Sequence, residues 1–160
     1  MSVSRRPHRT GYTLAEVLIV IAIIGILAAV ALPRLGRIRD AGQMSSATTR
    51  FSRAVMAARQ AAIQRGRRSH FKHSGSKVWV TLDTTGAGTD SVIVTSELSL
   101  TDLYGVEVTA PTGVSTIEYD PRGISTQPDK KVFRFKHIGS GNQDSLCVSR
   151  LGNTIREKCP

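Results

Sequence analysis

The chain has 160 residues, of which 40% are hydrophobic and only 5% aromatic, and its formal net charge is +10. This length fits one globular domain with an anchoring segment and argues against two full domains. The low aromatic content predicts a core built from Val, Ile, Leu and Ala more than from rings.

The positive charge is concentrated in the first half of the chain. Residues 1–80 contain 14 Lys and Arg against two acids, whereas residues 81–160 contain 8 basic and 10 acidic residues. A basic half suits anionic lipid headgroups, acidic partner subunits or nucleic acid, and charge alone does not choose among these partners.

The N-terminus has the composition of a targeting leader followed by a membrane helix. Residues 1–11 contain three arginines and no acid, and they end at Gly11, directly before an apolar block. From Val17 to Leu32 every residue is Val, Leu, Ile, Ala or Gly. With residues 12–16 the block reaches about 30 Å as a helix, the thickness of a bilayer core. An ordinary signal peptide, cut so that the mature chain starts near Leu32, is the alternative.

Charge does not orient this block, because Arg34, Arg37 and Arg39 beyond it match the three arginines of the leader. Long C-terminal domains cross a membrane regardless of such a tie. We therefore expect a single-pass protein whose C-terminal domain lies in the periplasm, with these three arginines at anionic headgroups.

Glu16 is an acid inside the apolar block, four residues from Tyr12. A carboxylate there costs about 2.5–3.5 kcal/mol on insertion scales, so it requires a partner. If the leader is cut after Gly11, the new amino group of Tyr12 can neutralise Glu16 on the same helix or on a neighbouring subunit. The alternative is a lone carboxylate that reaches the headgroups or is protonated.

Pro33 ends the apolar block, and we expect a kink or a local break of the helix there. Beyond it, apolar residues recur at steps of three and four, which predicts an amphipathic helix to about Arg65, ending at Gly66. The predicted apolar stripe consists of Met44, Ala47, Phe51, Val55, Ala58 and Ala62.

After Gly66 the pattern changes to short β-rich runs separated by turn residues. We predict one antiparallel sheet, or two small ones, packed on the apolar stripe. The predicted strands are 77–82, 91–98, 105–109, 115–119, 132–137 and 145–149.

Cys147 and Cys159, the two cysteines of the chain, enclose 11 residues near its C-terminus. The spacing suits a disulfide that closes a terminal hairpin if this end faces an oxidising periplasm. Such a bridge would contribute about 2–3 kcal/mol in the chain-entropy model. Two free buried thiols are the alternative.

The run from Gly11 through Tyr12, Glu16 and the apolar block to Pro33 resembles the class III leader and N-terminal helix of type IV pilins and type II secretion pseudopilins. The resemblance implies cleavage after Gly11 by a prepilin peptidase, N-methylation of Tyr12, storage in the inner membrane, and extraction into a filament with a core of bundled helices. The implied partners are other pilin or pseudopilin subunits, the peptidase, inner-membrane lipid and an assembly platform.

The rest of the chain resembles the GspH/FimT-type minor pilins and pseudopilins. Residues 117–123, Ile-Glu-Tyr-Asp-Pro-Arg-Gly, are similar to the strand-Pro-x-Gly turn of that branch, and residues 147–156 are similar to its ending. The resemblance implies a low-copy structural subunit of a secretion pseudopilus or a surface pilus. A turn and a last hairpin without any ligand are the alternative interpretation of these motifs.

Some FimT-like members bind DNA during uptake through a C-terminal Gly-Arg-x-Arg element. Here Gly152 is followed by Asn153, and the second arginine of the element is displaced by one position to Arg156. Arg150, Arg156 and Lys158 still gather three cations, so DNA binding is a second hypothesis, beside a solvated basic end.

No catalytic or cofactor motif is present in the sequence. His70 and His73 lie three apart without further ligands, and we expect exposed loop histidines and no metal site. There is no nucleophile elbow and no phosphate-binding loop. We predict a structural protein and not an enzyme.

The predicted fold is α+β, a pilin-like lollipop in which a long N-terminal helix packs on a C-terminal antiparallel β-domain. Its expected parts are a leader (1–11), a transmembrane and filament-core helix (12–33), an amphipathic helix (34–66) and a β-rich domain (67–160).

Overall fold

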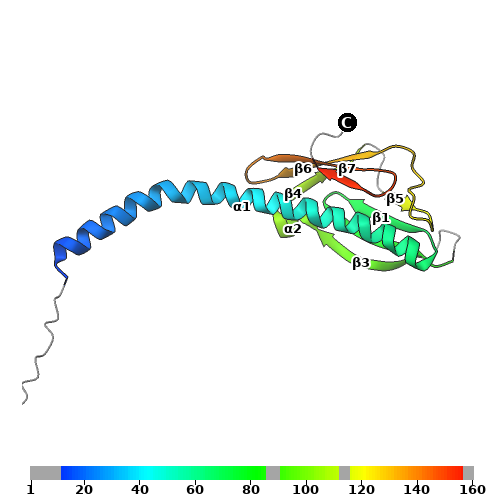
Figure 1. Cartoon of the computed structure of the whole chain (residues 1–160), viewed down its shortest axis with the longest axis horizontal. Coiled ribbons are helices and arrows are strands. Elements are labelled where there is room, and N and C mark those ends of the chain that lie inside the picture. The colour runs from blue at the N-terminus through cyan, green and yellow to red at the C-terminus, as the bar shows by residue number, and fades with distance from the viewer. Residues whose placement is uncertain (1–11, 86–90, 112–115, 157–160) are drawn as a thin grey trace, which may run out of the picture. The chain divides into compact units, whose positions relative to one another are not determined.

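The computed structural model describes residues 12–85, 91–111 and 116–156. The chain forms two compact units, residues 1–38 and residues 39–160. One helix, α1 (Leu14–Arg65, 52 residues), begins in the first unit and ends in the second (Figure 1). A long apolar helix followed by antiparallel sheets confirms the predicted α+β fold.

In the first unit, α1 leaves its apolar surface uncovered. Every large apolar side chain from Val17 to Leu32 is 51–68% exposed. This part of α1 is long and apolar enough to cross a membrane. The helix continues through position 33, so no local break occurs there, and the kink that the sequence predicts as the alternative stays a prediction. A proline removes one backbone hydrogen bond, and transmembrane helices tolerate this loss where other groups bond the freed carbonyl.

In the second unit, α1 presents the predicted apolar stripe to the β-domain. The stripe, from Met44 to Ala62, is buried throughout, and the helix ends at Arg65, directly before Gly66, as the sequence predicts. Small residues at Ala47, Ala58 and Ala62 bring the helix axis close to the strands, because they keep the intervening layer thin.

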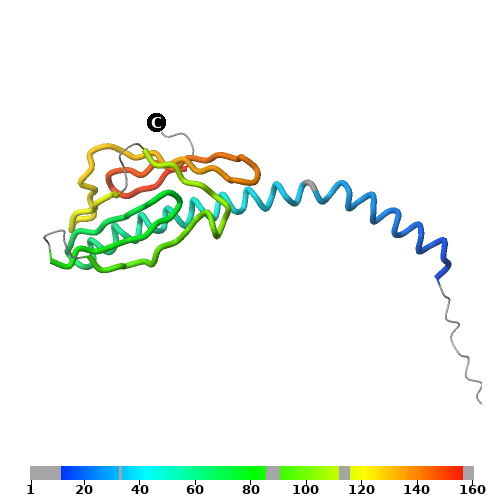
Figure 2. Tube along the Cα trace, turned by 180° about the vertical axis from the view of Figure 1, so that it is seen from behind, coloured from blue at the N-terminus to red at the C-terminus, as the bar shows by residue number. Residues whose placement is uncertain are grey.

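The strands form two four-stranded antiparallel sheets. The first, sheet A, has the order β3-β2-β1-β5, and the second, sheet B, has the order β4-β6-β7-β8. Figures 1 and 2 show both sheets along the second half of α1. The strands are β1 (Ser69–Ser74), β2 (Lys77–Asp83), β3 (Ser91–Ser99), β4 (Val106–Thr109), β5 (Thr116–Tyr119), β6 (Lys131–His137), β7 (Gln143–Val148) and β8 (Thr154–Arg156).

Three elements were not predicted from the sequence: β1, β8 and the short helix α2 (Leu100–Tyr104). Strand β1 has one large apolar residue, Phe71, so it lacks the alternation that reveals a strand. His70 and His73 therefore lie on a strand and are half-buried, which makes their prediction as exposed loop histidines wrong. The His73 ring packs against Phe133 with ring centroids 5.5 Å apart.

The centre of the core is aromatic. The chain contains four phenylalanines, and all four are fully buried in one cluster. The centroid of the Phe51 ring on α1 lies 5.0 Å from that of Phe71 on β1. It lies 4.7 Å from the ring centroid of Phe133 and 5.2 Å from that of Phe135, both on β6. Aliphatic residues are more numerous in the core, as predicted. The four rings lie in the same core cluster with them.

Polar contacts add to the packing of α1. The buried ring of His137, at the end of β6, accepts a hydrogen bond at Nδ1 from the Ser140 amide (3.1 Å). This contact leaves Nε2–H to donate to the Gln43 side chain (2.9 Å). Farther along the helix, the Ser69 hydroxyl donates to the Ala58 carbonyl (2.5 Å).

Phe51→Ala should lower the free energy of unfolding by about 3–5 kcal/mol, because it removes the ring that contacts both sheets and leaves a cavity. The measurement is denaturant unfolding of the full chain in detergent, followed by the fluorescence of its single tryptophan, Trp79. Met56→Ala, at an exposed position of the same helix, is the control and should change stability by less than about 1 kcal/mol. Equal losses for the two variants would contradict the central role of the cluster.

Candidate functional site

The first turn of α1 is closed by a capping box. The Glu16 carboxylate accepts hydrogen bonds from the Thr13 amide (2.8 Å) and the Thr13 hydroxyl (3.0 Å), both at Oε2. In return, the Glu16 amide donates to the Thr13 hydroxyl (3.2 Å). A threonine before the helix with a glutamate three residues later is the sequence signature of this motif. Thr13 was not among the predicted site residues, although its spacing from Glu16 matches this signature.

In a single chain, Glu16 already has hydrogen-bond partners at the start of its own helix. Its carboxylate is paired with Thr13, and neither bond uses Oε1. Tyr12, the first described residue, is highly exposed, while Gly11 and the rest of the leader lie outside the described residues. The pairing of Glu16 with a processed amino terminus, and an assembly role of Pro33, stay predictions.

A second group of residues forms a tight turn after β5. The Asp120 carboxylate accepts from the amides of Arg122 (3.0 Å) and Ile124 (2.9 Å), and it forms an ion pair with the Arg122 guanidinium (3.0 Å). The hydrogen bond from Ile124 is the main cause that lowers the pKa of Asp120, with Arg122 contributing. This side chain therefore has a structural task in the turn.

The two motifs that carry the family resemblance meet on α1. Gly123 of the first motif accepts a hydrogen bond from Arg59 Nε at its carbonyl (3.3 Å). A Cβ added at Gly152 of the second motif would lie 3.0 Å from Arg59 Cδ and 3.3 Å from the Tyr119 hydroxyl. The Ser125 amide donates to the Arg150 carbonyl (2.8 Å) and ties the two loops together. The motifs thus fasten the β-domain to the helix around Arg59.

The C-terminal cations have partners within the chain. Arg156 donates to the Asp144 carboxylate (2.9 Å) and to the Ser45 hydroxyl (3.2 Å), so it links β8, β7 and α1. Arg150 Nε donates to the Ser125 carbonyl (3.4 Å). Lys158, the third predicted cation, lies outside the described residues. Of the two described arginines, Arg156 has an acidic partner, whereas Arg150 is exposed and bonds a carbonyl through Nε.

Cys147 is buried on β7, and no described cysteine is free. Its predicted partner, Cys159, lies outside the described residues, so the bridge between the two stays a prediction. The described part of the chain also contains no group of three or more His, Cys, Asp and Glu that could hold a metal ion.

Two family models match the chain. The prokaryotic N-terminal methylation motif matches residues 6–32, which include the last six residues of the predicted leader, Tyr12 and Glu16. The model described as type II transport protein GspH matches residues 47–152, which cover most of the β-domain and residues 47–65 of α1.

Known proteins agree with these matches. The chain is similar to the type IV major pilin protein PilA of Myxococcus xanthus (strain DK1622), with 39% identity over 72 residues, which are 44% of this chain and 33% of PilA. Its fold is similar to the type IV minor pilin FimU of Pseudomonas aeruginosa PAO1 (TM-score 0.58, 13% identity, 76% of this chain and 92% of FimU). It is also similar to the minor pseudopilin EpsH of Vibrio cholerae (TM-score 0.52, 14% identity, 69% of this chain and 92% of EpsH).

A capped apolar helix with a methylation motif, continuing into a helix-supported β-domain, defines the class of pilin-like structural subunits. Within this class, the chain belongs to the type II transport protein GspH family. The chain matches about a third of the length of this curated relative.

Gly123→Ala should destabilise the domain by about 1–3 kcal/mol, because overpacking adds to the strain of a left-handed backbone. Gly123 has φ +78°, and a Cβ there would lie 2.6 Å from Ile63 Cδ1. Gly75→Ala is the matched control, since Gly75 has φ +55° but open space around it. Unfolding in denaturant should show a larger loss for Gly123→Ala, and Ile63→Ala in the same chain should restore part of it. Equal losses at both glycines would refute the packing role.

The domain should lose stability in alkali through Tyr119. Burial raises the pKa of its phenol to about 12, and among the described residues its hydroxyl has no hydrogen-bond partner. The same phenol ionises near pH 10 in the unfolded chain. The contribution of Tyr119 to the free energy of unfolding is therefore complete below about pH 10 and is lost as the pH rises towards 12. Tyr119→Phe should remove this loss while changing stability little at pH 7. Unfolding curves at pH 8–11.5 test it; a constant difference between the two proteins would contradict it.

Proposed function

We propose that this chain is a minor, low-copy subunit of a membrane-anchored pilus or pseudopilus that serves protein secretion. The observation that carries the proposal is the helix segment from Val17 to Leu32, whose large apolar side chains are all exposed and which follows one capped carboxylate. Exposed apolar surface of this extent requires a covering, which lipid supplies to a stored subunit and other helices supply in a filament.

Processing supplies the charge that the segment needs. Cleavage after Gly11 by a prepilin peptidase leaves an N-methylated amine on Tyr12, as the matched methylation motif suggests. The amine of a neighbouring subunit pairs with Glu16 at Oε1, because both Thr13 bonds fall on Oε2. In a medium of low dielectric this contact fixes the register between adjacent helices.

The remaining parts have supporting tasks. Residues 12–33, including Pro33, form the membrane and filament-core helix, and residues 34–66 carry the β-domain of residues 67–160. The β-domain faces the periplasm, where a bridge between Cys147 and Cys159 would close its last hairpin. In this proposal the partners are other pilin or pseudopilin subunits, inner-membrane lipid and the assembly platform.

DNA uptake is the weaker candidate. It relied on Arg150, Arg156 and Lys158, and the two described arginines are bonded to Ser125 and Asp144 instead. Binding a phosphate would first require breaking the ion pair of Arg156. No observation favours this function over assembly, and we do not propose it.

The test compares two substitutions of Glu16 in the full chain in its host. Glu16→Ala removes both the capping box and the charge, whereas Glu16→Gln keeps an oxygen for Thr13 and replaces the other oxygen with an amide donor. If Glu16 binds an amine, both variants should stay in the membrane and lose at least tenfold in filament incorporation. Sheared filaments and membranes are quantified by immunoblot.

Intact-mass measurement of the wild-type protein completes the experiment. We expect a mature chain that starts at methylated Tyr12. A chain that starts near Leu32 would instead indicate an ordinary signal peptide, and a retained leader would also overturn the proposal. Normal incorporation of Glu16→Gln would restrict Glu16 to its capping role.

A further inference from the structure

Strand β3 is an unprotected edge of sheet A. It pairs with β2 alone in the described part of the chain, and residues 91–97 are all exposed. Val92, Ile93 and Val94 form a continuous apolar run, and Ile93 is 66% exposed. The one charged residue of the strand, Glu97, is paired with Lys77 (2.7 Å). Natural sheets usually protect such an edge with free charges or a cover, because its open N–H and C=O groups bind other strands.

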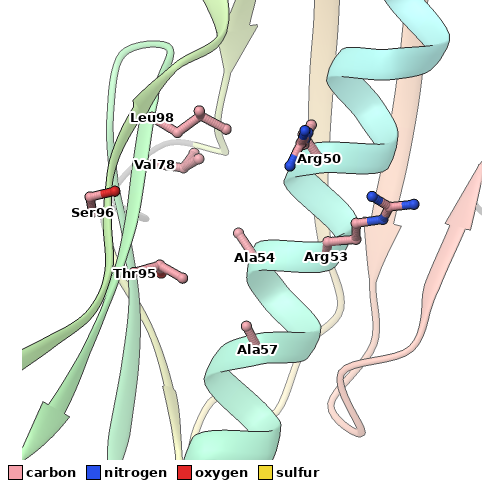
Figure 3. Close-up of a pocket in the computed structure, with 8 residues that line it drawn as sticks. All are labelled: Arg50, Arg53, Ala54, Ala57, Val78, Thr95, Ser96 and Leu98. Atoms are coloured by element: carbon pink, nitrogen blue, oxygen red, sulfur yellow. The ribbon is translucent and has the colours of Figure 1, made fainter.

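A groove of about 300 Å³ separates this edge from α1. Ala54 and Ala57 of the helix face Thr95 and Leu98 of β3 across it, as Figure 3 shows. Most of these side chains are small or apolar. The groove can therefore accept side chains of an extended segment, and the register shifts in the β2–β3 pairing lie along the same stretch of the strand.

Two arginines of α1 line the groove. Arg50 and Arg53 also line a neighbouring depression of about 260 Å³, together with the hydroxyl-bearing Ser46, Thr49 and Tyr104. Both arginines are exposed, and neither forms an ion pair with a described residue. Other arginines of the domain do have acidic partners; Arg68 pairs with Glu118 and Arg156 with Asp144.

We propose that β3 and this groove bind an extended, carboxylate-bearing segment of a neighbouring filament subunit that is not a copy of this chain. The segment adds a strand to the edge of β3 and places its acid on Arg50 and Arg53. Backbone pairing provides affinity in strand addition, and side-chain pockets provide specificity. Guanidinium groups suit carboxylates because their donors match both oxygens.

Charge decides against a second copy of this chain as the occupant. The full chain has a formal charge of +10, and removal of residues 1–11 with their three arginines leaves +7, so two copies still repel each other. A second β3 would also bring the paired Glu97 as its single acid. Nucleic acid would match the two arginines but leave the apolar edge from Val92 to Val94 unused. An acidic, apolar peptide strand uses both features.

This inference rests on the proposed function, and its test separates the two. A photo-crosslinking residue, p-benzoyl-phenylalanine, replaces Ser96 in the full chain in its host, and crosslinked peptides are identified by mass spectrometry. We expect a crosslink to a different pilin-like subunit, within a peptide that contains Asp or Glu. The same residue at Ile155, an exposed position on the edge strand β8 of the other sheet, controls for unspecific capture.

Charge reversal provides the matched comparison. Arg50→Glu with Arg53→Glu should reduce the Ser96 crosslink at least tenfold. Arg65→Glu with Arg67→Glu changes the net charge equally, outside the groove, and should leave the crosslink intact. A crosslink to a second copy or to nucleic acid, equal effects of the two double variants, or no crosslink from chains present in filaments would overturn the inference. Absence of the chain from filaments would instead contradict the proposed function.

Discussion

The contacts of the Phe51 ring hold the β-domain together as one unit. Sheets A and B share no strand, and each has only four strands. The ring reaches Phe71 of one sheet and Phe133 and Phe135 of the other. Each sheet has to bury its apolar face against another element, and packing against a helix is one way to do so. The helix supplies that partner, so the order of the β-domain depends on a residue that precedes every one of its strands.

The motifs that identify the family are explained by packing at the other end of the stripe. Gly123 and Gly152 stand where a side chain would strike Ile63, Arg59 or Tyr119. Asp120 closes the turn that brings Gly123 to the helix. These residues act on the fit between the β-domain and α1, and none of the described ones needs a ligand to account for its position.

Sequence reasoning succeeded where periodicity is strong. The buried stripe of α1, its end at Arg65 and six of the strands followed from alternation and turn residues. Strand β1 was missed because a polar strand with one phenylalanine shows no period, and β8 because three residues are too few. The aromatic centre was not predictable, since composition counts rings without saying that they meet.

The candidate site, too, was predicted only in part. Glu16 stood out because an acid in an apolar block is costly, yet its bonds to Thr13 went unnoticed. At the other end of the chain, the ion pair of Arg156 with Asp144 depends on the pairing of β7 with β8. A single sequence does not reveal which strands are neighbours, and so it could not show that this cation is occupied.

The asymmetry of the Glu16 carboxylate has a consequence for how a subunit could join others. One oxygen maintains the end of its own helix, and the other is not used by Thr13. An incoming amine would thus meet an acceptor that is already oriented, and no turn of helix has to unwind to release it. Little conformational freedom is lost at that step, and preorganisation of this kind increases the affinity of docking.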